Sequence, residues 1–253
     1  MVDREMQWLL DEKYAGIKSE AFYADCKKLV LGVPLAYLIG FTSFLHCKIW
    51  LDARPLIPRP ETEFWVEEAI KVIHGSNTLS LGLGKQSPRI LDLCAGSGCI
   101  GIAIAKTVPQ AQVDFGEIDA NLIDTITKNL KENGIDENRH TVTQSNLFSK
   151  LPDAYDYILC NPPYIDESLG RAETSVKAHE PYVALFGGKD GLEIIIQLIT
   201  GAPKHLAPGG QLWIEHEPEQ SRDIQEIGLR YGFTTSTQLD QFGVERYSIL
   251  VLQ

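Results

Sequence analysis

The chain lacks the features that would place it in a membrane or in an oxidising compartment. Its 253 residues contain no apolar run approaching the roughly 18 residues of a membrane-spanning helix. The opening stretch, MVDREMQWLLDEK, is charged and lacks the apolar core of a signal peptide. The five cysteines (Cys26, Cys47, Cys94, Cys99 and Cys160) form no C-x-x-C pair and match no zinc spacing. We therefore expect a soluble, cytoplasmic protein with reduced cysteines and no metal site.

Clustered basic residues are also scarce. The formal net charge is −11, and the longest run of basic residues is Lys27-Lys28. A protein that follows duplex phosphates usually presents a basic patch or stripe. The composition therefore disfavours a nucleic-acid substrate without excluding one, because a fold can bring distant basic residues together.

The first third of the chain predicts small elements around one large domain. Hydrophobic residues make up 44% of the chain and charged residues 23%, as in ordinary globular domains. One or two amphipathic helices are predicted over residues 3–32, and a β-hairpin within residues 41–60. A helix follows over residues 60–75, and the small, polar, glycine-rich stretch at 76–87 is predicted to be a linker.

From Pro88 onward, strand and helix patterns alternate. Strands are predicted at 89–94, 111–118, 140–145, 155–160, 209–216, 233–239 and 246–253, and helices at 99–108, 120–134, 190–206 and 218–232. This alternation indicates right-handed βαβ units and a doubly wound α/β sheet. The last two strands have no helix between them, which predicts an antiparallel C-terminal edge.

A glycine-rich turn follows the first of these strands. Gly96, Gly98 and Gly101 form G-x-G-x-x-G between a strand and a helix, and Glu117 lies 19 residues beyond Gly98. This pattern fits a dinucleotide site, with the carboxylate on a ribose. It also fits any other nucleotide-type cofactor, and a tight strand–helix turn with no ligand.

Charge separates these alternatives. A dinucleotide places its anionic pyrophosphate at the helix N-terminus. Asp92 ends the strand four residues before Gly96, and its carboxylate would repel a phosphate. S-adenosylmethionine carries a sulfonium and an ammonium group and has no phosphate. Asp92 therefore favours a methyl donor over a dinucleotide.

Several stretches resemble one family. LDLCAGSG followed later by NPPY resembles class I methyltransferases that methylate a planar exocyclic or amide nitrogen. PLAYLIG, LIPRPETE, EPYVALFGGKDGL, LAPGGQLWIE and DQFGVER together are similar to the PrmC/HemK family, from about Pro34 to the C-terminus. The most specific stretches are PRPETE and EPYVALFGGKDG, because NPPY also occurs in adenine and guanine methyltransferases. Family members methylate the side-chain amide nitrogen of the glutamine in the Gly-Gly-Gln motif of peptide-chain release factors.

The chemistry explains the Asn-Pro-Pro-Tyr corner. An amide nitrogen attacks a methyl sulfonium only when its N–H bonds are held so that the lone pair faces the methyl carbon. The side-chain oxygen of Asn161 and the carbonyl of Pro162 would accept these N–H bonds, and proline limits backbone freedom there. Both acceptors also favour the positive charge that develops on nitrogen. Tyr164 would pack on the face of the planar group, and Pro163 would complete the substrate site. Alternatively, the corner is a simple turn that ends a strand, as Asn and Pro commonly form. Its predicted position favours a functional role, because it follows a strand at the edge where open α/β sheets bind ligands.

The resemblance also implies a donor site. Its expected residues are Asp92, the loop Cys94, Ala95, Gly96, Ser97 and Gly98, Glu117 on the ribose, Asn146 and Leu147 near the adenine, and Asn161. Asn146 and Leu147 depart from the family, which often has an acidic residue followed by an aromatic one there. The PRPETE stretch is expected to form part of the pocket wall, with Arg59 and Glu61 in structural roles.

The resemblance implies a class I methyltransferase sheet of seven strands with three parts along the chain. These are a short N-terminal helical region over residues 1–40 that docks the substrate, a β-hairpin linker over 41–60, and an S-adenosylmethionine-dependent domain over 61–253. We expect a monomer that acts on release factors and on neither a membrane nor nucleic acid. The alternatives are an adenine or guanine amino methyltransferase, against which the acidic charge and PRPETE count, and a regulatory module without catalysis, against which the intact Asn161–Tyr164 stretch counts.

Overall fold

The computed structural model describes residues 2–80, 87–152, 154–171 and 173–253. The helices are α1 (Val2–Tyr14), α2 (Glu20–Val30), α3 (Leu35–Ile39), α4 (Pro60–Ser80), α5 (Cys99–Thr107), α6 (Ala120–Glu132), α7 (Thr174–His179), α8 (Tyr182–Leu185), α9 (Glu193–Gly201) and α10 (Ser221–Arg230). The strands are β1 (Phe41–Phe44), β2 (Cys47–Trp50), β3 (Arg89–Leu93), β4 (Gln112–Glu117), β5 (His140–Gln144), β6 (Tyr155–Cys160), β7 (Leu206–Glu215), β8 (Phe233–Leu239) and β9 (Glu245–Leu252).

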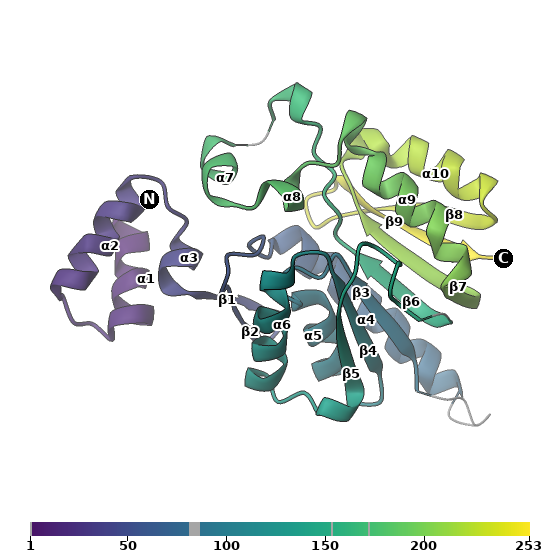
Figure 1. Cartoon of the computed structure of the whole chain (residues 1–253), viewed down its shortest axis with the longest axis horizontal. Coiled ribbons are helices and arrows are strands. Elements are labelled where there is room, and N and C mark those ends of the chain that lie inside the picture. Colours follow the sequence, from purple (N-terminus) through teal and green to yellow (C-terminus); the bar gives the residue numbers. More distant parts are fainter. Residues whose placement is uncertain (1, 81–86, 153, 172) are drawn as a thin grey trace.

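The strands after residue 88 form one mixed sheet (Figure 1). Within the described residues it has seven strands in the order β5-β4-β3-β6-β7-β9-β8. The strands from β5 to β7 are parallel, whereas β9 is antiparallel to both β7 and β8. The predicted doubly wound fold and its antiparallel C-terminal edge are confirmed. The strand order reverses between β3 and β6, which is where open α/β sheets bind ligands.

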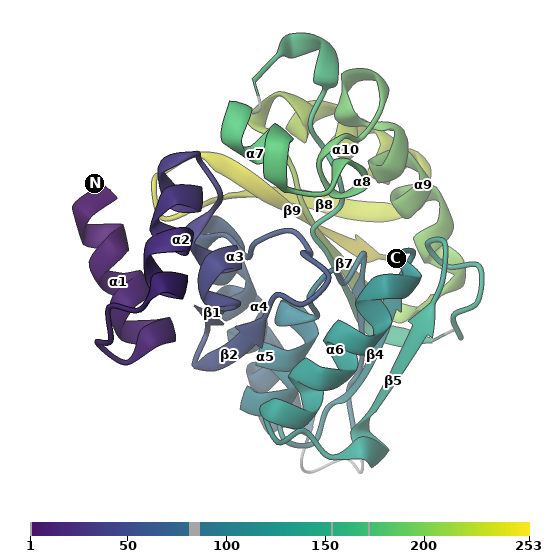
Figure 2. The same cartoon turned by 60° about the vertical axis from the view of Figure 1, so that its left-hand side comes forward.

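Alternating side chains of the strands pack on both faces of the sheet. In β3, Ile90 faces the cluster formed with α4, α5 and α6, whereas Leu91 and Leu93 face the cluster formed with α9 and α10. Ile90, Leu91 and Leu93 are all buried. Because both faces of the central strands are covered, the sequences of these strands are nearly continuous apolar runs. Figures 1 and 2 show the two helical layers on opposite sides of the sheet.

The N-terminal helices form a small core of their own. Leu9, Leu10, Phe22, Leu29 and Leu38 pack together, apart from the two clusters of the main sheet. A Ser19 side chain caps α2 by accepting from the backbone N–H of Phe22. These helices lie at one end of the molecule, next to the β1–β2 hairpin (Figure 2). One or two helices were predicted in residues 3–32, and the structure has two there, α1 and α2.

Side chains of α6 hold the hairpin against the main domain. Asn129 donates to the carbonyl of Trp50 and accepts from its N–H, and Asn133 makes the same pair of hydrogen bonds with Lys48. One turn earlier on the same face, Thr125 donates to the carbonyl of Asp52. The amide side chains therefore act as a substitute strand along the edge of β2.

Several predicted elements differ from the structure. The helix predicted to end at residue 75 continues to Ser80, and residues 81–86 of the predicted linker lie outside the described residues. The strands of the hairpin end at Trp50, and residues 51–59 form a loop instead. The short helices α7 and α8 were not predicted, because six and four residues are too few for a helical period. Within the residues that the structure describes, every helix is too short or too polar to span a bilayer.

Candidate functional site

The glycine turn brings α5 very close to the sheet. Gly96 and Gly98 have φ of +56° and +79°, a left-handed backbone that glycine adopts without strain. At Gly101 a Cβ atom would lie 2.4 Å from the ring of Phe115 in β4. The first two glycines therefore shape the turn, and the third permits the close packing of helix on sheet.

Strand register aligns the predicted site residues at one edge. Leu93 of β3 pairs with Cys160 of β6, so Cys94 and Asn161 follow at the same level. Cys160 also pairs with Ile214 of β7, and Glu215 is the next residue of that strand. The donor loop, the Asn-Pro-Pro-Tyr corner and Glu215 consequently meet at the carboxyl edge of neighbouring strands.

A cavity of about 280 Å³ lies at this edge. The predicted residues that line it are Cys94, Gly96, Glu117, Asn146, Leu147, Asn161 and Pro163. Further residues that the sequence did not indicate are Arg54, Leu56, Ile118, Asp119, Leu122, Ser145, Pro181, Tyr182, Val183, Ala184, Phe186 and Ile194. Largely apolar walls with a carboxylate and two side-chain amides are a suitable environment for an adenosyl group.

Asp92 lies near the carboxyl end of β3. Its side chain is fully buried and does not line the cavity, and neither do Ala95, Ser97 and Gly98. One carboxyl oxygen of Asp92 accepts from the backbone N–H of Gly101 at 2.8 Å. Asp92 faces α5 because it shares the face of β3 with Ile90, not with Leu93. Burial raises the pKa of this carboxyl well above its ordinary value, whereas the hydrogen bond from Gly101 lowers it.

Glu117 lines the larger cavity and is held by two backbone N–H groups. One carboxyl oxygen accepts from the N–H of Gly96 at 2.7 Å, and the other from the N–H of Asp119 at 2.8 Å. Burial raises the pKa of Glu117, whereas these backbone donors lower it. The carboxylate is thus tied to the glycine loop and still lines the cavity.

A second cavity of about 160 Å³ adjoins the first. Asn161, Pro162 and Tyr164 line it, and it shares Asn161, Leu56 and Ala184 with the larger cavity. Among the described residues, no donor to the side-chain oxygen of Asn161 or to the carbonyl of Pro162 is found. Asn161 thus stands between two adjoining spaces, one of which could hold a donor and the other an acceptor.

The corner is held from behind by the segment that follows α8. The N–H of Ile165 donates to the carbonyl of Leu185, and the N–H of Gly187 donates back to the carbonyl of Ile165. A Cβ at Gly187 would lie 2.5 Å from the carbonyl oxygen of Pro163, and one at Gly191 would lie 1.9 Å from that of Tyr164. The glycines of GGKDG are therefore needed for the close approach of two backbones.

The PRPETE and EPYVALF stretches contact each other directly. Arg59 forms an ion pair with Glu180, whose side chain is only 2% exposed. The second oxygen of Glu180 accepts from the N–H of Ile57 at 3.1 Å. The pair joins the loop before α4 to the segment that walls the donor cavity, in agreement with a structural role for Arg59.

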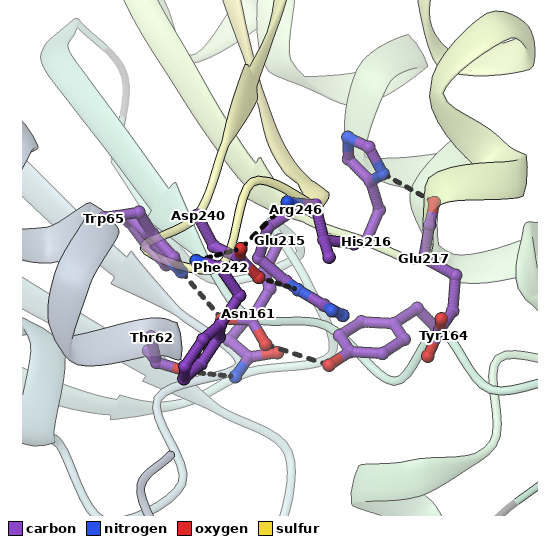
Figure 3. Close-up of polar contacts among 11 residues, drawn as sticks. Thr62, Trp65, Asn161, Tyr164, Glu215, His216, Glu217, Asp240, Phe242 and Arg246 are labelled. Carbon is purple, nitrogen blue, oxygen red and sulfur yellow. Dashed lines mark hydrogen bonds and ion pairs between the residues drawn. The ribbon is translucent and has the colours of Figure 1, made fainter. Parts of the chain in front are cut away.

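A buried carboxylate stands behind the corner (Figure 3). Glu215 accepts hydrogen bonds from Thr62 and Trp65 at 2.7 Å each and from the hydroxyl of Tyr164 at 2.9 Å. Burial raises the pKa of Glu215, while these three donors and the positive charge of Arg246 lower it. Sequence reasoning missed Thr62, Trp65 and Glu215. The available signal was the position of Glu215 at the carboxyl end of a strand.

The part of the chain that the structure describes contains no candidate metal site. No three of its histidine, cysteine, aspartate and glutamate side chains gather to hold an ion.

Comparisons with known proteins agree with this geometry. The methyltransferase small domain family matches residues 69–178. A release factor glutamine methyltransferase of Rhodopirellula baltica is 42% identical over 211 residues, which are 78% of this chain and 69% of that protein. A ribosomal protein uL3 glutamine methyltransferase of Bordetella pertussis is 34% identical over 78% of this chain and 66% of that protein.

A solved structure shows the same fold at low sequence identity. The hMettl16 catalytic domain, crystallised with a 3′UTR hairpin, superposes with a TM-score of 0.62 at 17% identity, covering 82% of this chain and 76% of that one. At this identity the likeness concerns the fold alone.

The strand order and the position of the cavities define a class I methyltransferase. Sequence identity to the Rhodopirellula baltica protein over 78% of the chain identifies the family within this class. The chain belongs to the release factor glutamine methyltransferase family.

Proposed function

We propose that this enzyme transfers a methyl group from S-adenosylmethionine to the side-chain amide nitrogen of the glutamine in the Gly-Gly-Gln motif of peptide-chain release factors. One observation carries the proposal. Asn161, with its side-chain oxygen Oδ1, and Pro162, with its backbone carbonyl, line a second cavity that adjoins the donor cavity. An amide –NH2 offers two N–H donors, and two fixed acceptors match them.

The larger cavity would hold the donor. Glu117 lines this cavity and would accept from ribose hydroxyls, and Leu122, Ile118 and Leu147 would give apolar contact to the adenine. The donor supplies an electrophilic methyl carbon on a sulfonium and leaves as the neutral thioether once the carbon–sulfur bond breaks. The nitrogen then loses a proton to solvent, so the site needs no general base before transfer.

The chain's own residues would supply orientation and electrostatics. Two acceptors on the amide N–H bonds direct the nitrogen lone pair toward the methyl carbon, a proximity effect of several kcal/mol. They also stabilise the positive charge on nitrogen during transfer. Tyr164 would line the acceptor cavity with its ring, because Glu215 holds its hydroxyl.

The N-terminal region is proposed to dock the release factor to a monomeric enzyme. Between α1 and α2 lies an open groove of about 710 Å³. Met6, Leu10 and Phe22 line it together with Lys18 and Lys27. Asp3 also lines the groove, so its polar residues carry both signs of charge and its apolar lining would make most of the contact with a partner protein.

Substrate identity is tested by locating a label. The protein is incubated with methyl-labelled donor and, in separate reactions, a release factor, ribosomal protein uL3 and total RNA from one source. We expect label on the Gly-Gly-Gln glutamine of the release factor. Label on RNA or on uL3 with none on the release factor would overturn the proposal.

Loss of the Glu117 carboxylate should weaken donor binding. Glu117→Ala removes the proposed ribose acceptor and also releases the N–H of Gly96. We expect the dissociation constant for S-adenosylmethionine to rise about ten- to hundredfold, since a hydrogen bond to a charged group contributes roughly 1.5–3 kcal/mol. Calorimetric titration measures this change, with the exposed Glu137→Ala as a matched control. Unchanged affinity would remove Glu117 from the donor site.

A further inference from the structure

We propose that Thr62 and Glu215 set the orientation of the Asn161 side-chain amide, and so act as positioning residues for the methyl acceptor. The catalytic use of this orientation rests on the proposed function. The hydrogen-bond geometry that carries it belongs to the chain itself (Figure 3).

The direction of the network is fixed first at Trp65. An indole N–H can only donate, and that of Trp65 donates to Glu215 Oε2 at 2.7 Å. Trp65 itself is completely buried, and its ring stacks on that of Tyr247 at 6.1 Å between centroids. Glu215 Oε2 is therefore an acceptor held in one place by a side chain that cannot reverse its role.

Thr62 passes this direction on to Asn161. The Thr62 hydroxyl has one proton, and it donates that proton to Glu215 Oε2 at 2.7 Å. Toward any third group the hydroxyl can then only accept. The neighbour it meets is Nδ2 of Asn161, which donates at 3.2 Å.

The consequence concerns the other end of the Asn161 amide. With Nδ2 directed at Thr62, Oδ1 is left for the acceptor side, where the methylated nitrogen needs a hydrogen-bond acceptor. The reversed amide would place Oδ1 against the Thr62 oxygen, two acceptors with no proton between them. It would also present N–H donors to an amide nitrogen that has only N–H bonds to offer.

Burial makes the arrangement strict. Thr62 is 2% exposed and Glu215 is 1% exposed, so water cannot easily replace either partner. The same carboxylate accepts from Tyr164, so one group orients the two corner residues whose side chains carry polar atoms. Thr62 comes from the first turn of α4, 99 residues from Asn161, which assigns a purpose to the threonine of PRPETE.

Two variants of Thr62 separate orientation from packing. Thr62→Val keeps the shape and removes the hydroxyl, whereas Thr62→Ser keeps the hydroxyl and removes a methyl group. We expect Thr62→Val to lower kcat by about ten- to hundredfold, as for a misplaced reacting group, with unchanged affinity for S-adenosylmethionine. Thr62→Ser should stay within about threefold of the parent enzyme, a margin set by the small cost of one lost methyl group.

A spectroscopic measurement tests the hydrogen bond between Asn161 and Thr62 without any methyl-acceptor substrate. In protein labelled with ¹⁵N-asparagine, the side-chain amide signal of Asn161 is assigned by its loss in Asn161→Asp. We expect slow exchange of these amide protons with water in the parent and in Thr62→Ser, and faster exchange in Thr62→Val.

The outcomes are distinguishable from failure of the proposed function. If the parent enzyme methylates RNA instead of a release factor, the substrate proposal fails while the exchange measurement still tests the role of Thr62. If Thr62→Val keeps parental kcat and slow exchange at Asn161, the positioning role is overturned while the proposed function stands.

Discussion

Asn161→Ala is expected to lower methyl transfer to the release factor by about 10²–10³-fold, the loss that follows removal of one electrostatic acceptor or donor at a reacting centre. Donor affinity should change little, because many other residues line the larger cavity. Asn161 lines both cavities, and in the proposed mechanism its oxygen would hold the attacking nitrogen. Single-turnover transfer and calorimetric donor binding measure the two effects separately.

A matched control for this substitution lies at the opposite end of the sheet. Asn138 is exposed in the turn before β5, at the amino edge, and Asn138→Ala should leave both quantities unchanged. Near-parental turnover in Asn161→Ala would contradict the acceptor geometry. A large loss of donor affinity would instead assign Asn161 chiefly to the donor.

Gly191→Ala is expected to be severely destabilising. A Cβ there would lie 1.9 Å from the carbonyl oxygen of Tyr164 and 2.4 Å from Nε2 of Gln220, at a φ of +67°. The left-handed backbone costs roughly 1–2 kcal/mol for a residue with a Cβ, and overpacking adds roughly 1–3 kcal/mol. The free energy of unfolding should fall by about 2–5 kcal/mol, and transfer should be lost because the corner is displaced. Urea denaturation gives the first value and the labelled-donor assay the second.

Gly134→Ala isolates the cost of the backbone conformation. Gly134 has a φ of +70°, and a Cβ there would meet nothing within 4 Å. We expect a loss of only about 1 kcal/mol with activity retained. Equal effects of the two substitutions would mean that GGKDG does not support the corner by close approach.

The fold could be predicted from the sequence because its signals are local and repeated. The strand at 155–160 is buried on both faces, and its sequence is apolar except for the half-buried Asp156, which the sequence shows directly. The lack of a helix between 239 and 245 indicated the antiparallel edge. The end of α4 could not be placed, because Gly75 is tolerated inside a helix and no stronger stop signal precedes residue 80.

The site was only partly predictable. Motifs carry their own order, so Asn161, Pro162, Tyr164 and Glu117 could be named from the sequence. The role of Asp92 at the donor site stays a prediction. Its direction toward α5 could not be predicted, because the sequence does not give the rotation of a strand that is buried on both faces.

The residues proposed to position Asn161 left little local signal, apart from the place of Glu215 at the carboxyl end of a strand. Thr62 and Glu215 are 153 residues apart in the chain, and only the register of β6 with β7 brings Glu215 beside the corner. Likewise, the wall formed by residues 181–184 was contained in a recognised motif, but its place against the donor cavity required the fold.

The central claim is that two acceptors of the corner hold the nitrogen that is methylated. The most direct test is a structure of the protein with S-adenosylhomocysteine and a release-factor domain that contains the Gly-Gly-Gln loop. We predict that the glutamine amide nitrogen lies within about 2.7–3.2 Å of both Asn161 Oδ1 and the Pro162 carbonyl oxygen. A glutamine amide bound elsewhere, or one whose oxygen faces the Asn161 side chain, would contradict the account.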